Sequence, residues 1–202
     1  MALNNPIHRF TMMTGVAGVI LAGGASRRFG ADKAAALLDG RPMIAHVATR
    51  ISPQVDAIAI AGAQKAYGLP YPVLGDGAYH AKGPLAGLLA GLRWAAAEGY
   101  SHAATVPCDV PQLPLNLLAL LTQPATNNPV VLQSEHGTEA ACALWPVALA
   151  PKVTDRLDEG QSLSMTGMLE ASNAHVVPVS PERLDGSFAN VNTTEDLAAL
   201  QT

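Results

Sequence analysis

The segment of this sequence with the clearest chemical potential is a loop that begins at Gly23 and Gly24 and ends at Lys33. Glycines let a backbone turn with positive φ and approach a ligand closely, and successive N–H groups in such a loop can surround an anion. Arg27, Arg28 and Lys33 add positive charge to the same short segment. Because backbone donors and cationic side chains together suit a triphosphate, the loop predicts a triphosphate site.

The loop differs from two familiar phosphate-binding motifs. Five residues separate Gly24 from Gly30, and Ala31 follows, whereas a P-loop has four residues between its glycines and then Lys-Ser/Thr. The dinucleotide fingerprint Gly-x-Gly-x-x-Gly is not matched either. The alternative is a tight turn with solvated arginines, but the clustered cations directly after a predicted strand favour the phosphate site.

Two carboxylates follow predicted strands. Asp109 stands between Pro107 and Pro111, and ligands of parallel α/β sheets bind at the carboxyl ends of strands. Because carboxylates suit hard cations, Asp109 is the candidate Mg²⁺ ligand, with a turn-capping role as the alternative. Asp76 precedes residues 83–87, which are predicted to begin a helix whose free N–H groups favour anions. A simple loop aspartate is the alternative there.

The elements that would position these residues alternate between apolar runs and helical patterns, which predicts βαβ units and a largely parallel sheet. Strands are predicted over residues 17–22, 55–61, 71–74, 102–106, 130–133, 140–145 and 175–179. Helices are predicted over 42–51, 84–97, 114–121, 146–157 and 162–171, and from Thr193, where Thr193 and Asp196 suit a capping box. We expect a loose tail over 1–14 and one domain over 15–202.

Composition excludes several classes of protein. Of the 202 residues, 49% are apolar and 14% are charged, which argues against intrinsic disorder. The net charge of −4 and the absence of an extended basic stripe argue against a nucleic-acid partner. The apolar run 16–22 is far shorter than the roughly 20 residues of a membrane span. Cys108 and Cys142 form neither a disulfide framework nor a zinc site, which favours a cytoplasmic location.

The chain resembles the molybdenum cofactor guanylyltransferases of the MobA type, within the larger NTP-transferase family. The matching segments occur in the family's order, at 21–33, 53–55, Asp76, 83–87, 107–109 and 188–193. The first segment is shared by many nucleotidyltransferases. The Pro-Cys-Asp of 107–109 and the Asn-x-Asn-Thr of 190–193 are, in combination, more specific to the molybdenum cofactor branch.

This resemblance implies a fold, a reaction and its partners. The fold would be a three-layer α/β/α, Rossmann-like nucleotidyltransferase fold, with a mostly parallel sheet and one antiparallel strand. The reaction would transfer GMP from GTP to the terminal phosphate of molybdenum–molybdopterin, with Mg²⁺, and would release pyrophosphate. Molybdoenzymes or their chaperones would be further partners.

The resemblance also implies which residues hold the nucleotide. Leu21, Ala22 and Gly23 match the backbone that binds it, and Gly23 and Gly24 would donate their N–H groups to the pyrophosphate. Asp76 matches an aspartate on the GTP side of the pocket.

A second group of residues matches the charged centre and the acceptor side. Lys33 matches the phosphate-binding lysine, and Lys33 with Arg28 would stabilise the charge that builds on pyrophosphate. Asp109 matches the aspartate that binds GTP through Mg²⁺. Asn190 and Asn192 match asparagines on the molybdopterin side.

Three departures from the family pattern leave alternatives open. Ala61 and Ala63 stand where the family usually has asparagine. Residues 159–164 replace a basic turn, and residues 138–141 replace a proline-containing strand entry. The alternatives are a cytidylyltransferase for the same cofactor, a sugar-phosphate nucleotidyltransferase, and a nucleotide-binding relative without catalytic activity.

Overall fold

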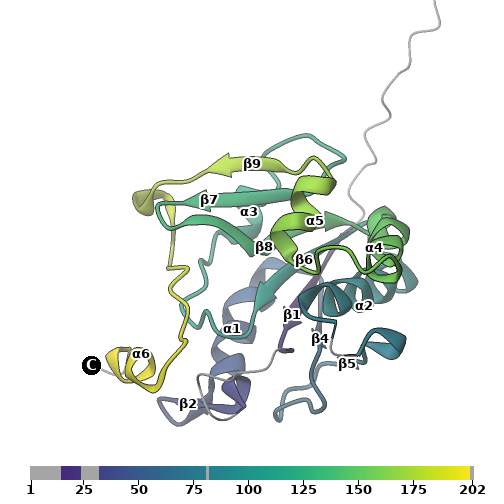
Figure 1. Cartoon of the computed structure of the whole chain (residues 1–202). Coiled ribbons are helices and arrows are strands. Elements are labelled where there is room, and N and C mark those ends of the chain that lie inside the picture. The colour runs from purple at the N-terminus through teal and green to yellow at the C-terminus, as the bar shows by residue number, and fades with distance from the viewer. Residues whose placement is uncertain (1–14, 24–31, 81, 201–202) are drawn as a thin grey trace, which may run out of the picture.

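The computed structural model describes residues 15–23, 32–80 and 82–200. Its main sheet has seven strands within these ranges, in the order β5-β4-β1-β6-β8-β7-β9 (Figure 1). Their bounds are β1 Val16–Leu21, β4 Ala57–Ala61, β5 Val73–Leu74, β6 His102–Pro107, β7 Val130–Ser134, β8 Gly137–Pro146 and β9 His175–Pro178. The predicted tail, 1–14, lies outside the described residues.

The directions of the strands confirm the predicted sheet. The strands β5, β4, β1 and β6 pair in parallel, as do β7 and β9. Within the described chain, β8 alone runs against its neighbours, because it pairs antiparallel with both β6 and β7. The carboxyl ends of β4, β1 and β6 therefore lie next to one another at the same edge of the sheet.

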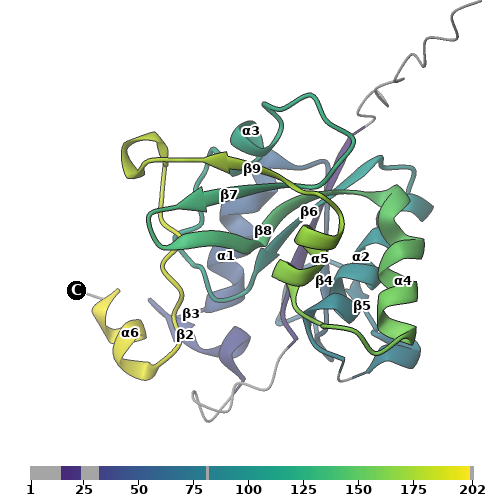
Figure 2. The ribbon, with the colours of Figure 1, turned by 45° about the horizontal axis from the view of Figure 1, so that its top comes forward.

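Helices cover both faces of this sheet and make the three predicted layers (Figure 2). The helices are α1 Met43–Ile51, α2 Pro84–Ala97, α3 Leu117–Leu121, α4 Ala150–Asp158, α5 Met165–Ala171 and α6 Thr194–Ala199. Successive residues of a strand point to opposite faces: Val16 and Ile20 of β1 pack in the core with α1 and α3. Val19 and Leu21 pack in a second core with α2, α4 and α5.

Helix α2 begins at Pro84, as predicted, because proline suits the first helical turn. Helix α1 begins one residue later than predicted, since Pro42 is extended and belongs to a small hairpin. That hairpin joins β2 (Leu37–Leu38) to β3 (Arg41–Pro42) and was not predicted. Asp39 and Gly40, its central residues, both have positive φ, which is typical of a tight hairpin turn.

Other elements start later than predicted, because the residues before them adopt a different local structure. Residues 52–54 form a 3-10 helix, so the second predicted strand starts at Ala57 rather than 55. Helix α3 starts at Leu117 rather than 114, and the carbonyl of Pro114 accepts a hydrogen bond from Gln54. The capping box of α6 is present as predicted. None of the helices in the described ranges is long and apolar enough to cross a membrane.

Candidate functional site

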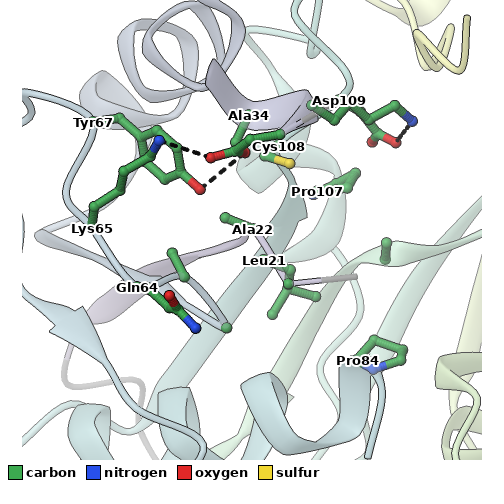
Figure 3. A pocket seen from close by; sticks show the side chains of 16 residues that line it. Leu21, Ala22, Ala34, Gln64, Lys65, Tyr67, Pro84, Pro107, Cys108 and Asp109 are labelled. Carbon is green, nitrogen blue, oxygen red and sulfur yellow. Dashed lines mark hydrogen bonds and ion pairs between the residues drawn. The ribbon is translucent and has the colours of Figure 1, made fainter. Parts of the chain in front are cut away.

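A cavity of about 700 Å³ lies at the carboxyl ends of β1, β4 and β6 (Figure 3). The parallel register brings the ends of these three strands together, so residues far apart in the sequence share one space. Each strand is followed directly by a segment that lines the cavity. The lining residues that carry the argument are Leu21, Ala22, Gly23, Lys33, Lys65 and Asp109.

Two glycines that line the cavity, Gly23 and Gly62, let two segments of backbone pack closely together. Gly62 has a φ of +76°, and a Cβ added to it would lie 2.8 Å from the Cα of Gly23. A Cβ on Gly23 would in turn lie 3.0 Å from the Cα of Gly62. The backbone N–H of Ala22 donates to the carbonyl of Ala61 at 2.9 Å. The segment after β1 therefore packs backbone against backbone on the segment after β4, which only glycine permits.

The charged centre of the cavity is an ion pair between Lys33 and Asp109. Lys33 Nζ donates to Asp109 Oδ2 at 2.7 Å, and the two side chains are 14% and 20% exposed. Lys33 begins a 3-10 helix (Lys33–Ala35), and Asp109 follows β6. The same Nζ donates to Asn192 Oδ1 at 2.9 Å. Three segments of the chain thus converge on one ammonium group.

The other carboxylate oxygen of Asp109, Oδ1, could coordinate a metal ion. Asp109 Oδ1 is buried and has no hydrogen-bond partner among the described residues, which leaves a charged acceptor unsatisfied. Those residues contain no group of three or more His, Cys, Asp or Glu side chains that could hold a metal ion by itself. Mg²⁺ typically takes one or two carboxylates and completes its shell with water and substrate phosphate. A divalent metal ion held by this single carboxylate would therefore need water or a bound ligand to complete its shell.

The opposite wall of the cavity carries a group that the sequence analysis missed (Figure 3). Asp32 Oδ2 lies 3.0 Å from Lys65 Nζ, and the hydroxyl of Tyr67 donates to Asp32 Oδ1 at 3.3 Å. The Lys65 ammonium lies 5.0 Å from the centre of the Tyr67 ring. Burial and the neighbouring Asp32 raise the pKa of Tyr67 to about 12, so its hydroxyl stays a donor at neutral pH.

The thiol of Cys108 takes no part in this polar network. Burial, with the neighbouring Asp109 carboxylate, raises the pKa of Cys108 to about 12. A neutral thiol is a weak nucleophile, because the thiolate is the reactive form. Cys108 therefore contributes a small buried side chain to the wall of the cavity.

The structure brings most of the predicted site residues together, and separates two. Leu21, Ala22, Gly23, Lys33 and Asp109 line the same cavity. Asn192 reaches it through Lys33. Gly24 and Arg28 lie outside the described residues.

Asp76 and Asn190 stand apart. Asp76 lines a separate depression of about 500 Å³ beside α2, together with Tyr79 and Arg93. Its Oδ1 is buried without a partner in the described chain, and burial raises the pKa of Asp76. Asn190 is exposed, two residues before Asn192.

The residues that depart from the family pattern also have defined places. Ala61 is fully buried at the end of β4 and packs against α2. Ala63 and Ala141 line the cavity itself. One residue of each of the departures at 61–63 and 138–141, Ala63 and Ala141, therefore lines the same space as Lys33 and Asp109.

The chain is similar in sequence to known proteins of one family. A family model described as the MobA-like NTP transferase domain matches residues 18–176. The molybdenum cofactor guanylyltransferase of Acidiphilium cryptum (strain JF-5) is 40% identical over 189 residues, which cover 91% of this chain and 92% of that protein. The molybdenum cofactor guanylyltransferase of Cereibacter sphaeroides is 39% identical, with 92% and 95% covered.

A solved structure shares the fold. The molybdopterin-guanine dinucleotide biosynthesis protein A of Archaeoglobus fulgidus superposes with a TM-score of 0.74 at 20% sequence identity, over 92% of this chain and 96% of that one. The match of the family model over most of the chain, the identities to full-length relatives and the shared fold agree with one another. On these grounds the chain belongs to the MobA-like NTP transferase family.

Proposed function

We propose that this protein transfers GMP from GTP to the terminal phosphate of molybdenum–molybdopterin, forming molybdopterin guanine dinucleotide and pyrophosphate. The observation that carries the proposal is the pairing of Lys33 with Asp109 in a cavity at the carboxyl ends of adjacent parallel strands. The relatives that share about 40% of the sequence are molybdenum cofactor guanylyltransferases, which favours this reaction over cytidylyl transfer, sugar-phosphate activation or mere nucleotide binding.

The reaction needs no covalent bond between the protein and its substrates. An oxygen of the acceptor phosphate attacks the α-phosphorus of GTP in line, and a new P–O bond forms. The bond from the α-phosphorus to the bridging oxygen of the β-phosphate breaks, and pyrophosphate leaves with that electron pair. The acceptor phosphate is already ionised at pH 7, so no general base is needed. Positioning and charge stabilisation supply the rate.

Residues on the nucleotide side bind and orient GTP. The backbone of Leu21, Ala22 and Gly23 holds the nucleotide, and Gly23 and Gly24 donate their N–H groups to the pyrophosphate part. Support comes from the place of Leu21, Ala22 and Gly23 in the lining of the cavity and from the close packing of Gly23 on the segment after β4. Asp76 binds on the nucleotide side from the neighbouring depression, where one carboxylate oxygen is unpartnered in the described chain.

The charged residues act on the phosphates. Lys33, with Arg28, stabilises the negative charge that builds on pyrophosphate. Asp109 would hold Mg²⁺, and the charge of that ion would neutralise phosphate oxygens. Support for the metal ligand comes from the buried, unpartnered Oδ1 of Asp109. Asn190 and Asn192 act on the acceptor side, and the bond from Lys33 to Asn192 supports a place for the acceptor phosphate beside the lysine.

We further propose that the chain works in the cytoplasm as one nucleotidyltransferase unit over residues 15–202, and that molybdoenzymes or their chaperones receive its product. Support for a reducing compartment comes from Cys108 and Cys142, which are both free and buried.

Nucleotide-dependent stabilisation tests the proposal. Thermal unfolding is measured with Mg²⁺ and GTP, CTP, ATP or UTP in turn. A nucleotide present at a hundredfold excess over its Kd stabilises the native state by about 2.7 kcal/mol. We expect this stabilisation for GTP and much less for the other three. Stabilisation by CTP in preference to GTP, or by no nucleotide, would overturn guanylyl transfer.

A further inference from the structure

The turn before the C-terminal helix is tied to both members of the charged pair. The backbone N–H of Val191 donates to the backbone carbonyl of Asp109 at 2.9 Å, and Val191 is only 1% exposed. One residue later, Asn192 Oδ1 accepts from Lys33 Nζ at 2.9 Å. The position of this turn therefore decides whether the lysine has one partner or two.

A single carboxylate oxygen fixes that turn. Asp196 Oδ2 accepts from the backbone N–H of Asn192 at 2.7 Å and from that of Thr193 at 2.9 Å. The backbone N–H of Asp196 donates back to Thr193 Oγ1 at 3.1 Å, which closes the capping box. These backbone bonds lower the pKa of Asp196, so its carboxylate is charged at neutral pH.

A capping box usually stabilises its own helix, by about 1 kcal/mol for the N-cap side chain. Here the helix that it caps is small and peripheral, because α6 has six residues and none of them is buried. The turn that it holds, by contrast, contacts Lys33 through Asn192, although 159 positions of sequence separate these two residues. The Asp196 hydrogen bonds should therefore affect the position of Lys33 in the cavity more than the packing of the core.

We propose that Asp196 is a positioning residue: by holding the backbone of Asn192 and Thr193, it presents the Asn192 side chain to Lys33. The ammonium is then shared between the charged Asp109 and the neutral Asn192. Without Asp196 the turn loosens, Lys33 keeps Asp109 as its sole partner among these residues, and it is held less well for a phosphate. The inference rests on the proposed function, in which Lys33 binds the nucleotide's phosphates.

The first test compares two substitutions at Asp196 with a matched control. Asp196→Ala removes both backbone bonds, whereas Asp196→Asn keeps an oxygen that can accept them. Glu195→Ala removes the neighbouring first-turn carboxylate, which bonds to Thr194 Oγ1 at 3.2 Å and not to Asn192. All three should melt close to wild type because α6 buries no residue.

Two readouts follow the positioning role. The Kd of Mg²⁺-GTP, measured by calorimetry, should rise roughly tenfold in Asp196→Ala, the size of effect typical of supporting residues around a site. It should rise much less in Asp196→Asn and stay within about twofold in Glu195→Ala. Hydrogen exchange at the backbone amides of residues 192 and 193 should accelerate in Asp196→Ala alone.

A double-mutant cycle then tests whether Asp196 affects GTP binding through Asn192 or independently of it. If Asp196 acts through Asn192, the pair Asn192→Ala with Asp196→Ala binds GTP no more weakly than Asn192→Ala alone. Additive losses, or an Asp196→Ala protein that binds GTP like Glu195→Ala, would overturn the inference while leaving guanylyl transfer intact. A wild-type protein that binds no nucleotide would overturn the proposed function and the inference with it.

Discussion

Lys33 Nζ lies 2.7 Å from Asp109 Oδ2, although 76 positions of sequence separate the two residues. The contact follows from topology, because β1 and β6 are adjacent parallel strands and each residue comes after the carboxyl end of one of them. Both side chains are largely withdrawn from solvent, so their charges are weakly screened. The topology of the sheet thus forms the charged centre of the cavity.

Loss of the Asp109 carboxylate should remove metal-dependent turnover. Asp109→Asn keeps the shape of the side chain but replaces the buried, unpartnered carboxylate of the proposed metal ligand with a neutral amide. We expect pyrophosphate release to fall by a factor on the order of 10² to 10³, as for other groups that stabilise transition-state charge. A magnesium titration of the rate measures it, and near-normal turnover would refute the assignment.

Removal of the Lys33 ammonium should act on the same step without removing the metal ligand. Lys33→Ala is expected to lower the rate of pyrophosphate release by a similar factor on the order of 10² to 10³, because the charge on the leaving group is no longer neutralised. Lys152→Ala is the control, since this lysine of α4 bonds to the carbonyl of Ala171 and does not line the cavity. Equal rates in the two variants would count against Lys33.

The close approach of Gly62 to Gly23 predicts that a side chain at position 62 lowers the free energy of unfolding. Gly62→Ala adds a Cβ 2.8 Å from Gly23 Cα at a φ of +76°. Gly68 has nearly the same φ, +77°, but a Cβ there meets no atom within 4 Å. Both variants carry the backbone strain, and Gly62→Ala should lose roughly 1–3 kcal/mol more through the clash.

Chemical denaturation of the two glycine variants measures that difference. Because the clash displaces the segment after β1, Gly62→Ala should also bind GTP more weakly than Gly68→Ala. Equal unfolding free energies would show that the two segments are not packed against one another.

The raised pKa of Tyr67 makes a contribution to stability that depends on pH. The folded protein holds the proton of Tyr67 more tightly than the unfolded chain does, because the pKa rises from 10.0 to about 12. This contribution is fully present below pH 10 and is lost as the pH rises from 10 through about 12. Unfolding free energies measured across that range should fall less steeply in Tyr67→Phe than in wild type. Parallel curves would contradict the shift.

Local patterns predicted those elements whose ends are marked by residues with strong preferences. Helix α2 matches its predicted bounds because Pro84 marks its start and leucines at 85, 88, 89 and 92 mark one face. The capping box of α6 was likewise readable from Thr193 and Asp196. The hairpin of β2 and β3 escaped prediction because its two-residue strands are too short to show a period.

The site was predictable only where one segment carried its own signal. The glycines and Lys33 after β1, and Asp109 after β6, were each recognisable from local sequence. The contact between Asp32 and Tyr67 joins residues 35 positions apart, and its only local hint is that Asp32 precedes Lys33. The contact of Lys33 with Asn192 spans 159 positions and arises from tertiary packing.

The most direct test of guanylyl transfer follows the α-phosphate of GTP. GTP labelled at that position is incubated with the protein, Mg²⁺ and molybdenum–molybdopterin, and the products are separated. We predict that the label enters molybdopterin guanine dinucleotide, with one pyrophosphate released for each product, and that Asp109→Asn slows both by a factor on the order of 10² to 10³. Label that remains in GTP, or a dinucleotide product formed only when labelled CTP replaces GTP, would contradict the account.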